Sequence, residues 1–291
     1  MKKTIFIIGA GGLIGGAIQR VCSAKGYAVF GADKEVQNNN FQFIDITQKD
    51  TVAEAMQNIQ PDIVVLTAAL SHVDYCEEFP EESEKVNIHG LQNVLDALDK
   101  EKTKMIFFSS DYVFDGRTGP YGEGDQPNPL CVYGKHKLMA EELIKDRLKN
   151  YLIIRTTGAY GPEQKGKNFV LSLLKKLKDG EKVNVPFDQI GSPTYSENLA
   201  EVVEELARKE KQGVYNIAGP ELVDRYSFAK EICKVFRLPE GMLQSVLTSE
   251  LGQKAKRPLQ GGLKMDKVQK EISIPLVAYK QGLLHMRQQY E

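Results

Sequence analysis

Three residues of this chain have the types and the spacing for a carbonyl reduction. Ser110 precedes the segment CVYGKHK (residues 131–137), in which Tyr133 and Lys137 stand four positions apart. A hydride added to a carbonyl carbon leaves an alkoxide that needs a proton, and a tyrosine can give that proton when a nearby ammonium stabilises its anion. The serine hydroxyl could hold the carbonyl oxygen, and the lysine could also bind the ribose of the hydride donor.

The spacing alone decides little. In a helix, Tyr133 and Lys137 share one face, because positions i and i+4 are neighbours. The same letters also fit the start of a basic helix with no chemical role, and Lys135 and His136 are expected to be the solvated part of this turn. A dinucleotide site elsewhere in the chain would favour the catalytic interpretation.

A glycine-rich loop near the start of the chain could bind the hydride donor. The segment GAGGLIG places glycines at positions 9, 12 and 15, between an expected strand and an expected helix. Glycine allows a tight turn and lets backbone N–H groups approach a pyrophosphate, while the helix N-terminus favours negative charge. Such a loop can also merely pack a helix on a strand, but the strand–turn–helix context favours a dinucleotide.

A carboxylate 18 residues after Gly15 bears on the choice of coenzyme. Asp33 can accept hydrogen bonds from the adenosine ribose diol and would repel a 2′-phosphate, so it favours NADH, whereas the adjacent Lys34 would tolerate NADPH. Asp45 suits the adenine site and a helix cap equally well, and Ala68 and Ala69 could simply pack under a helix. The residues expected to bind NAD(P)H are Gly9, Gly11, Gly12, Leu13, Ile14, Gly15, Asp33, Lys34, Asp45, Ile46, Ala68, Ala69, Tyr133 and Lys137.

Alternating strands and helices should position these groups. Strands are expected at residues 4–9, 27–33, 41–46, 62–69, 104–110 and 151–156, and helices at 17–26, 50–59 after an N-cap at Thr47, 83–100 and 135–148. This alternation predicts an α/β fold, a Rossmann-type doubly wound parallel sheet covered on both faces. Ser110 would then point into the crevice at the carboxyl edge of the sheet.

The pattern loosens after about residue 160. A helix is expected at 168–180, and the tail is broken at Pro239, Pro258 and Pro275. We expect residues 1–160 to form the dinucleotide-binding domain and residues 161–291 to form mainly a smaller C-terminal substrate-binding lobe. A segment of about 195–218 is expected to return to the Rossmann domain.

Composition excludes several classes of protein. The net charge is near −1, so no global electrostatic argument favours nucleic acid or an anionic membrane as a partner. No segment approaches the roughly 20 apolar residues that a membrane-spanning helix needs. The four cysteines are scattered and form no CxxC pair, so neither a metal site nor a disulfide framework is expected. Free cysteines of this kind predict a cytoplasmic location.

Motifs along most of the chain resemble those of one family. In chain order they are GAGGLIG, VDYCE, SSDYVFDG, PYGEGDQPNPLCVYGKHKLMAEE, RTTGAYG, GKNFV, DQIGSPTY followed by NLA, and KRPL. With these motifs the chain resembles an extended short-chain dehydrogenase/reductase, and within that superfamily the dTDP-4-dehydrorhamnose reductase family. The resemblance implies NAD(P)H-dependent reduction of the 4-keto group of a nucleotide-activated deoxysugar, a step towards polysaccharide precursors.

The resemblance also implies roles for individual residues. Ser110, Tyr133 and Lys137 take the catalytic positions, with serine where the family usually has threonine. Gly158 stands where the family commonly has an aromatic residue at the sugar site, so the sugar and its nucleotide base stay open. The residues implied at the substrate are Asp111, Tyr112, Val113, Phe114, Asn168, Gln189, Ser192, Thr194 and Arg257, and turn or capping duties are equally open for the last five.

Two other functions stay open. Dehydratases of the superfamily need an acid and a base after the central hydroxyl, typically Thr-Asp-Glu, but here Asp111 is followed by Tyr112; epimerases are related too. A regulatory subunit that binds NAD(P) without turnover is the second alternative, because the regulatory β-subunit of methionine adenosyltransferase is similar in fold and motifs. The oligomeric state is also open, with a homodimer as one prediction.

Overall fold

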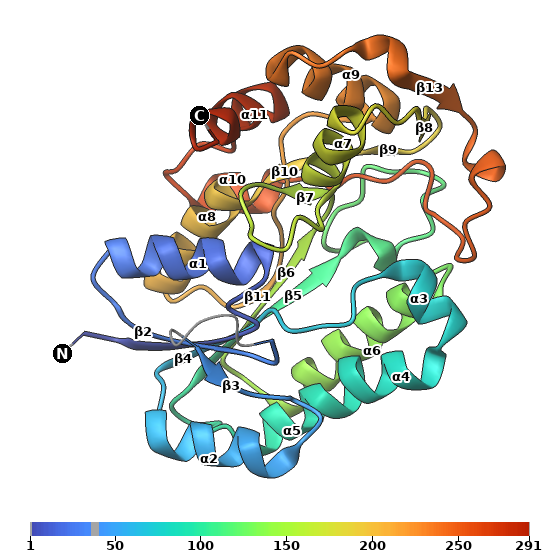
Figure 1. Cartoon of the computed structure of the whole chain (residues 1–291). Helices are drawn as coiled ribbons and strands as arrows, with labels where there is room; N and C mark the ends of the chain where they lie inside the picture. Colours follow the sequence, from blue (N-terminus) through green and yellow to red (C-terminus); the bar gives the residue numbers. More distant parts are fainter. Residues whose placement is uncertain (1, 36–40, 291) are drawn as a thin grey trace.

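A seven-stranded parallel sheet forms the centre of the structure (Figure 1). The computed structural model describes residues 2–35 and 41–290. In order across the sheet, the strands are β11 (Gly213–Asn216), β6 (Tyr151–Thr156), β5 (Lys104–Ser110), β4 (Ile63–Leu66), β1 (Thr4–Ile8), β2 (Ala28–Asp33) and β3 (Gln42–Phe43). The order reverses between β1 and β4, so their carboxyl ends flank the switch point at which sheets of this kind bind ligands. The predicted α/β, Rossmann-type fold is confirmed.

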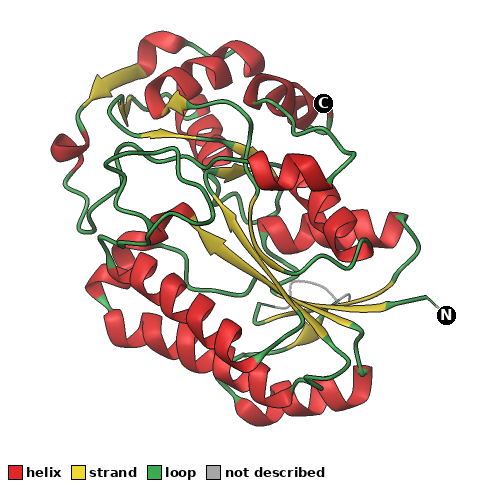
Figure 2. Ribbon diagram, turned by 180° about the vertical axis from the view of Figure 1, so that it is seen from behind, coloured by secondary structure: helices red, strands yellow, loops and turns green. Residues whose placement is uncertain are grey.

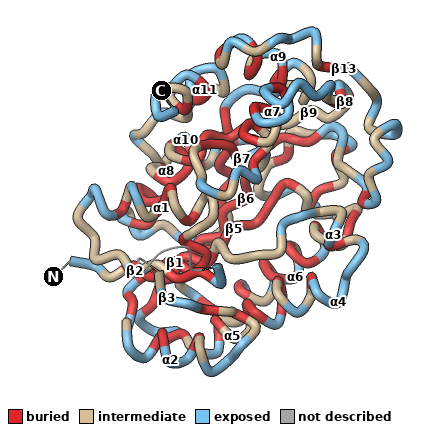
Figure 3. Tube along the Cα trace, in the orientation of Figure 1, coloured by how far each residue is buried: buried red, intermediate tan, exposed pale blue. Residues whose placement is uncertain are grey.

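Helices cover both faces of the sheet (Figure 2). On one face lie α1 (Leu13–Ala24) and α8 (Ser196–Arg208), and on the other α2 (Lys49–Ile59), α5 (Gly90–Ala97) and α6 (Val132–Arg147). Side chains alternate across a strand, so Ile5 and Ile7 enter the first core while Phe6 and Ile8 enter the second. The central strands are therefore largely buried (Figure 3), which explains their hydrophobic runs, although β5 and β6 also bury polar residues such as Ser109 and Arg155.

Two predicted elements differ in the structure. The strand expected at residues 41–46 is reduced to β3 at the sheet edge, where Phe43 is 55% exposed, and Ile44 and Ile46 are buried outside regular structure. The N-cap of α2 is Gln48 rather than the expected Thr47, and the Gln48 side chain makes no capping hydrogen bond.

The single helix expected at residues 83–100 is divided. It consists of α4 (Pro80–Glu84), a π-helical turn (Lys85–His89) and α5, and it follows the short α3 (Val73–Glu78). Helix α5 begins at Gly90, where a Cβ would lie 2.7 Å from Ile46 Cδ1. Glycine thus allows the helix to approach the loop after β3. Turns of π-helix inside α-helices often mark functional sites, and this one carries Asn87.

A third hydrophobic core lies in the second half of the chain. It is built from Tyr160, Leu174, Phe228, Ile232 and Leu283, among others. The elements around it are β7 (Ala159–Tyr160), α7 (Phe169–Lys178), β8 (Val183–Pro186), β9 (Ile190–Gly191), β10 (Thr194–Tyr195), β12 (Val223–Asp224), α9 (Arg225–Phe236), β13 (Leu243–Val246) and α11 (Tyr279–Gln288). Helix α8 instead packs on α1, and strand β11 pairs with β6 of the central sheet. The division into two lobes at residue 160 stays a prediction.

Short helices complete the chain. They are the 3-10 turns Asp111–Val113, Glu240–Met242 and Thr248–Leu251, and helix α10 (Asp266–Glu271). In the described part of the chain, no helix is long and apolar enough to cross a lipid bilayer.

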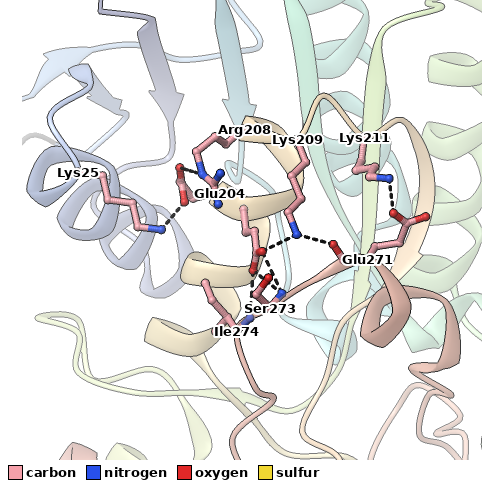
Figure 4. A network of polar contacts seen from close by, with 9 residues as sticks. Lys25, Glu204, Arg208, Lys209, Lys211, Glu271, Ser273 and Ile274 are labelled. Carbon is pink, nitrogen blue, oxygen red and sulfur yellow. Dashed lines mark hydrogen bonds and ion pairs between the residues drawn. The ribbon is translucent and has the colours of Figure 1, made fainter.

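Polar contacts tie the C-terminal segment to α8 (Figure 4). The carboxylate of Glu205 accepts the backbone N–H groups of Ser273 and Ile274 at 2.9 and 3.1 Å, and the ammonium of Lys209 at 2.7 Å. These bonds hold the pKa of Glu205 down at about 2 although burial raises it. The backbone after α10 is thereby anchored to the layer that covers the sheet.

Candidate active site

The structure brings Ser110, Tyr133 and Lys137 together. Ser110 is the last residue of β5, and Tyr133 and Lys137 occupy the first two turns of α6. The Lys137 ammonium lies 5.8 Å from the centre of the Tyr133 ring. Ser110 is close enough to Tyr133 to lower the pKa of the phenol. The three groups therefore meet at the carboxyl edge of the sheet, as a shared role in proton transfer requires.

Tyr133 holds its proton at neutral pH. Burial raises the pKa of Tyr133 well above its ordinary value, and the nearby Asp111 raises it further, against the lowering effect of Ser110. The expected stabilisation of the anion by Lys137 is not seen in this state, because the Lys137 ammonium donates to the Phe108 carbonyl oxygen at 2.8 Å. A protonated phenol is the form that a reductase needs in order to give a proton.

Burial also shifts the two charged neighbours. It lowers the pKa of Lys137 to about 8, although Cys76 and Glu141 oppose the shift, so the lysine is still mainly cationic at pH 7. It raises the pKa of Asp111 to about 6, against hydrogen bonds that include one from Ser110. Ser110 Oγ donates to Asp111 Oδ1 at 3.1 Å. Perturbed groups that cluster in a cleft are typical of functional sites.

The glycine loop fits a dinucleotide pyrophosphate. Gly9 has a φ of +96°, and a Cβ there would lie 2.5 Å from Ala68 N. At Gly15 a Cβ would lie 2.2 Å from Gly9 O, so only glycine lets α1 approach the loop this closely. Gly12 is the N-cap of α1 and makes no side-chain capping bond. The helix therefore presents its N-terminus, with its partial positive charge, uncapped at the switch point.

The adenosine end of this loop contains charged groups. Asp33 Oδ2 accepts the Gly11 N–H at 3.0 Å. Lys34 pairs with Asp45 at 2.7 Å. Asp45 also accepts the backbone N–H of Thr47 at 3.0 Å in a turn before α2, and so it is not the helix cap. The hydrogen bond from Lys34 keeps the pKa of Asp45 below its usual value although burial raises it.

The other expected coenzyme residues surround the same edge. Leu13 and Ile14 begin α1, and Ala68 and Ala69 follow β4 and are partly exposed. Ile46 is 5% exposed and packs against α5.

A cleft opens beside Ser110, Tyr133 and Lys137. It encloses about 630 Å³, counting space open to solvent. Its lining combines four of the predicted substrate residues, Asp111, Tyr112, Gln189 and Ser192, with Thr157, Gly158, Phe169, Ile190, Gly191, Pro193, Val223, Arg225, Phe228 and Pro258.

The remaining predicted substrate residues lie elsewhere. Val113 and Phe114 are 0% and 1% exposed and belong to the sheet core rather than the cleft. Asn168 caps α7 by accepting the Leu171 N–H at 3.2 Å, and Thr194 donates to the Thr157 carbonyl oxygen at 2.7 Å.

One cation of the cleft was missed by the sequence analysis. The Arg225 guanidinium lies 4.2 Å from the centre of the Phe169 ring, and within the described residues no carboxylate forms an ion pair with it. Burial lowers the pKa of Arg225, and the neighbouring Arg257 lowers it further. Arg257 itself pairs with Asp74 at 2.8 Å. No motif marked Arg225, because its role depends on a cleft formed by distant segments.

His136 corrects a second expectation. It is 8% exposed rather than solvated, because its Nδ1 lies 2.9 Å from Ser83 Oγ. Asn87 Nδ2 contacts the same Ser83 oxygen at 3.2 Å and donates to the Leu70 carbonyl oxygen at 3.0 Å. This network links α6 to the loop after β4, which carries Ala68 and Ala69. Lys135, by contrast, is exposed.

A buried ion pair fixes α6 on the sheet. Glu141 receives hydrogen bonds from Arg155 Nε and Nη2 at 2.8 and 2.6 Å and from Ser109 Oγ at 2.6 Å. Ser109 and Arg155 belong to β5 and β6, and Ser109 directly precedes Ser110. The pair therefore sets the register of the helix that carries Tyr133 and Lys137. Among residues 2–35 and 41–290, no group of three or more His, Cys, Asp or Glu side chains could hold a metal ion.

Comparisons with known proteins agree over nearly the whole chain. A family model described as "RmlD substrate binding domain" matches residues 1–291. The dTDP-4-dehydrorhamnose reductase of Aggregatibacter actinomycetemcomitans is 32% identical over 97% of this chain and 98% of that protein. The solved structure of dTDP-4-dehydrorhamnose reductase from Bacillus anthracis, in complex with NADP, superposes with a TM-score of 0.91 at 28% identity, covering 99% of this chain and 100% of that one.

One relative has a different description. The methionine adenosyltransferase 2 subunit beta of Danio rerio is 27% identical over 92% of this chain and 84% of that protein.

Proposed function

We propose a function from the premise that this chain belongs to the RmlD substrate-binding domain family. The protein reduces the 4-keto group of a nucleotide-activated deoxysugar with NAD(P)H. The observation that carries this proposal is the convergence of Ser110, Tyr133 and Lys137 at the edge of the sheet, beside an open cleft and a glycine loop.

The roles of the catalytic residues follow from their protonation. The bound dinucleotide supplies a hydride to the carbonyl carbon. Tyr133, held as a phenol, donates its proton to the substrate oxygen, and Ser110 positions that oxygen through its hydroxyl. Lys137 holds positive charge beside the phenolate that remains, which lowers the cost of proton transfer. In this scheme Lys137 exchanges its bond to the Phe108 carbonyl for the coenzyme ribose and the phenolate.

The charge of the cleft suits a nucleoside diphosphate. Arg225 lines the cleft without a carboxylate partner among the described residues, and Arg257 lies close enough to lower its pKa. Arg225 is half-buried, and a cation in such a position without an ion-pair partner favours an anionic ligand. The diphosphate of a nucleotide sugar would be such a ligand, and guanidinium groups bind phosphate well.

The sugar end of the cleft is wide on one side. Gly158 and Gly191 line it, and a Cβ at Gly158 would meet only the Pro193 backbone, with Cα at 3.4 Å and N at 3.9 Å. Because no side chain projects from Gly158, the cleft has room for a sugar that carries more than a 6-deoxyhexose ring does. The deoxysugar is therefore not assumed to be the rhamnose precursor.

The relation to the β-subunit from Danio rerio supports a second candidate function, a regulatory subunit that binds NAD(P) without turnover. The two candidates differ in one property. A reductase turns over a 4-keto sugar through Tyr133, whereas a regulatory subunit binds coenzyme and leaves it unchanged.

The test is a panel of 4-keto-6-deoxy nucleotide sugars that differ in base and sugar, each offered with NADH and with NADPH. We expect at least one pair to turn over, and Tyr133→Phe to lower kcat by about 10²- to 10⁴-fold without weakening coenzyme binding. Tyr290→Phe, on a tyrosine that is 49% exposed, is the matched control. Tight coenzyme binding without turnover of any sugar would favour the regulatory function.

A further inference from the structure

A lysine from the second half of the chain reaches the adenosine end of the coenzyme loop. Lys165 lies in the loop between β7 and α7, 132 positions after Asp33. Its ammonium lies 3.5 Å from Asp33 Oδ1 and 3.1 Å from Glu35 Oε2, and its side chain is 15% exposed. The burial and the two partners make this a defined position rather than a free surface lysine.

Close packing fixes the start of this loop beside α1, and hydrogen bonds within the loop brace its other end. At Gly161, where the loop begins, a Cβ would lie 2.1 Å from Ser196 Oγ and 3.5 Å from Leu13 Cδ1. At its other end, Asn168 donates from its backbone N–H and its side-chain amide to Glu163 Oε1, at 2.6 and 2.8 Å. Close packing at Gly161 thus holds the start of the loop near α1, and the bonds between Asn168 and Glu163 brace the loop from within.

Lys165 changes the electrostatics of Asp33. The carboxylate accepts the backbone N–H groups of Gly11 and Glu35 at 3.0 and 2.9 Å and faces the Lys165 ammonium. An unpaired carboxylate at this position repels a 2′-phosphate. Paired with Lys165, Asp33 loses much of that repulsion, and the ammonium stands where a 2′-phosphate would need a cation. Lys34, the cation adjacent in sequence, pairs with Asp45 instead.

We propose that Lys165 selects the coenzyme: it stays on Asp33 when NADH binds and pairs with the 2′-phosphate when NADPH binds. The inference rests on the proposed function for the presence of a dinucleotide and deepens it. It also opposes the expectation, drawn from Asp33 alone, that NADH is favoured. NADPH should bind at least as tightly as NADH, and its affinity should fall more steeply with added salt.

The experiment titrates NADPH and NADH into the full chain by calorimetry, with no sugar present. Lys165→Gln removes the charge and keeps most of the side-chain length. We expect it to weaken NADPH binding about tenfold or more and to change NADH binding much less, because a charge-assisted contact to phosphate is lost. Lys165→Arg should keep the NADPH affinity. Lys176→Gln, on an exposed lysine of α7, is the control.

The outcomes separate this inference from the function on which it rests. If both coenzymes bind the wild type and Lys165→Gln, correctly folded by circular dichroism, keeps the wild-type affinity ratio within about twofold, the assignment of Lys165 is wrong. If neither coenzyme binds the wild type, the dinucleotide-dependent function itself is wrong. A selective loss of NADPH affinity supports the assignment whether or not a sugar is reduced.

Discussion

Replacing Glu141 by alanine should destabilise the protein by about 3–5 kcal/mol, because it leaves a buried guanidinium without its anion. The side chains of Glu141 and Arg155 are 0% and 2% exposed. The Lys145 ammonium, 3.3 Å from Glu141 Oε2, is 35% exposed and so contributes little. Although burial raises the pKa of Glu141, the bonds from Arg155 hold it below its usual value.

The magnitude follows from what each variant leaves behind. Three charge-assisted hydrogen bonds of about 1.5–3 kcal/mol each would sum to more, but bonds within one network are not additive. Alanine loses all three and leaves Arg155 charged in a site of low dielectric. Glutamine keeps an acceptor oxygen, so Glu141→Gln should cost about 2–3 kcal/mol. The pair Glu141→Leu with Arg155→Met removes both charges and should recover most of the loss.

Urea unfolding of the four variants measures these costs. Glu142→Ala, on the exposed neighbouring position of α6, is the control and should change the free energy of unfolding by less than about 0.5 kcal/mol. If Glu141→Ala lowers the free energy of unfolding by less than about 1 kcal/mol, Arg155 does not depend on this carboxylate, because an unpaired buried guanidinium should destabilise the protein by more than that. A double variant, Glu141→Leu with Arg155→Met, that is no more stable than Glu141→Ala would contradict the prediction as well.

Three further predictions concern the site and its supports. Burial raises the pKa of Asp111 to about 6, so the folded state binds a proton more tightly than the unfolded state and loses stability as pH rises from about 4 to 6. In urea unfolding, Asp111→Asn should abolish this loss, which amounts to roughly 3 kcal/mol by pH 7, whereas parallel pH curves for the variant and the wild type would contradict the prediction. Hydrogen bonds lower the pKa of Glu205 to about 2, so its contribution to stability is present above its unfolded pKa of about 4.5 and is lost as pH falls towards 2. Glu205→Gln should therefore lower the free energy of unfolding by about 1–3 kcal/mol at pH 7 and by much less at pH 3, and an equal loss at both pH values would count against this. Gly15→Ala places a Cβ 2.2 Å from Gly9 O, so it should lower stability by about 1–3 kcal/mol and abolish coenzyme binding by calorimetry, whereas unchanged affinity would disprove the close-approach argument.

Local sequence pattern predicted most of the sheet. Strands β5 and β6 match the expected residues 104–110 and 151–156, because a strand buried on both faces gives an unbroken apolar run. The α/β fold and the family resemblance are both confirmed. The length of the edge strand was predicted wrongly: FQFIDI has the alternation of a strand, but only Gln42 and Phe43 pair with β2.

The parts that were missed depend on contacts between distant segments. His136 looked solvated because its sequence neighbours are lysines, yet Ser83 of another helix buries it. Arg225 and Lys165 stand in no motif, and their positions follow from how the second half of the chain folds back on the first. Val113 and Phe114 look like site residues by motif but turn into the core. The homodimer stays a prediction.

In the proposed reaction, Tyr133 donates a proton to a 4-keto nucleotide sugar. The most direct measurement is single-turnover oxidation of coenzyme by a 4-keto-6-deoxy nucleotide sugar, with wild type and Tyr133→Phe both saturated in coenzyme and sugar. We expect a rate lower by about 10²-fold or more in the variant, with both ligands bound as in the wild type. An equal rate in the two proteins would contradict this expectation.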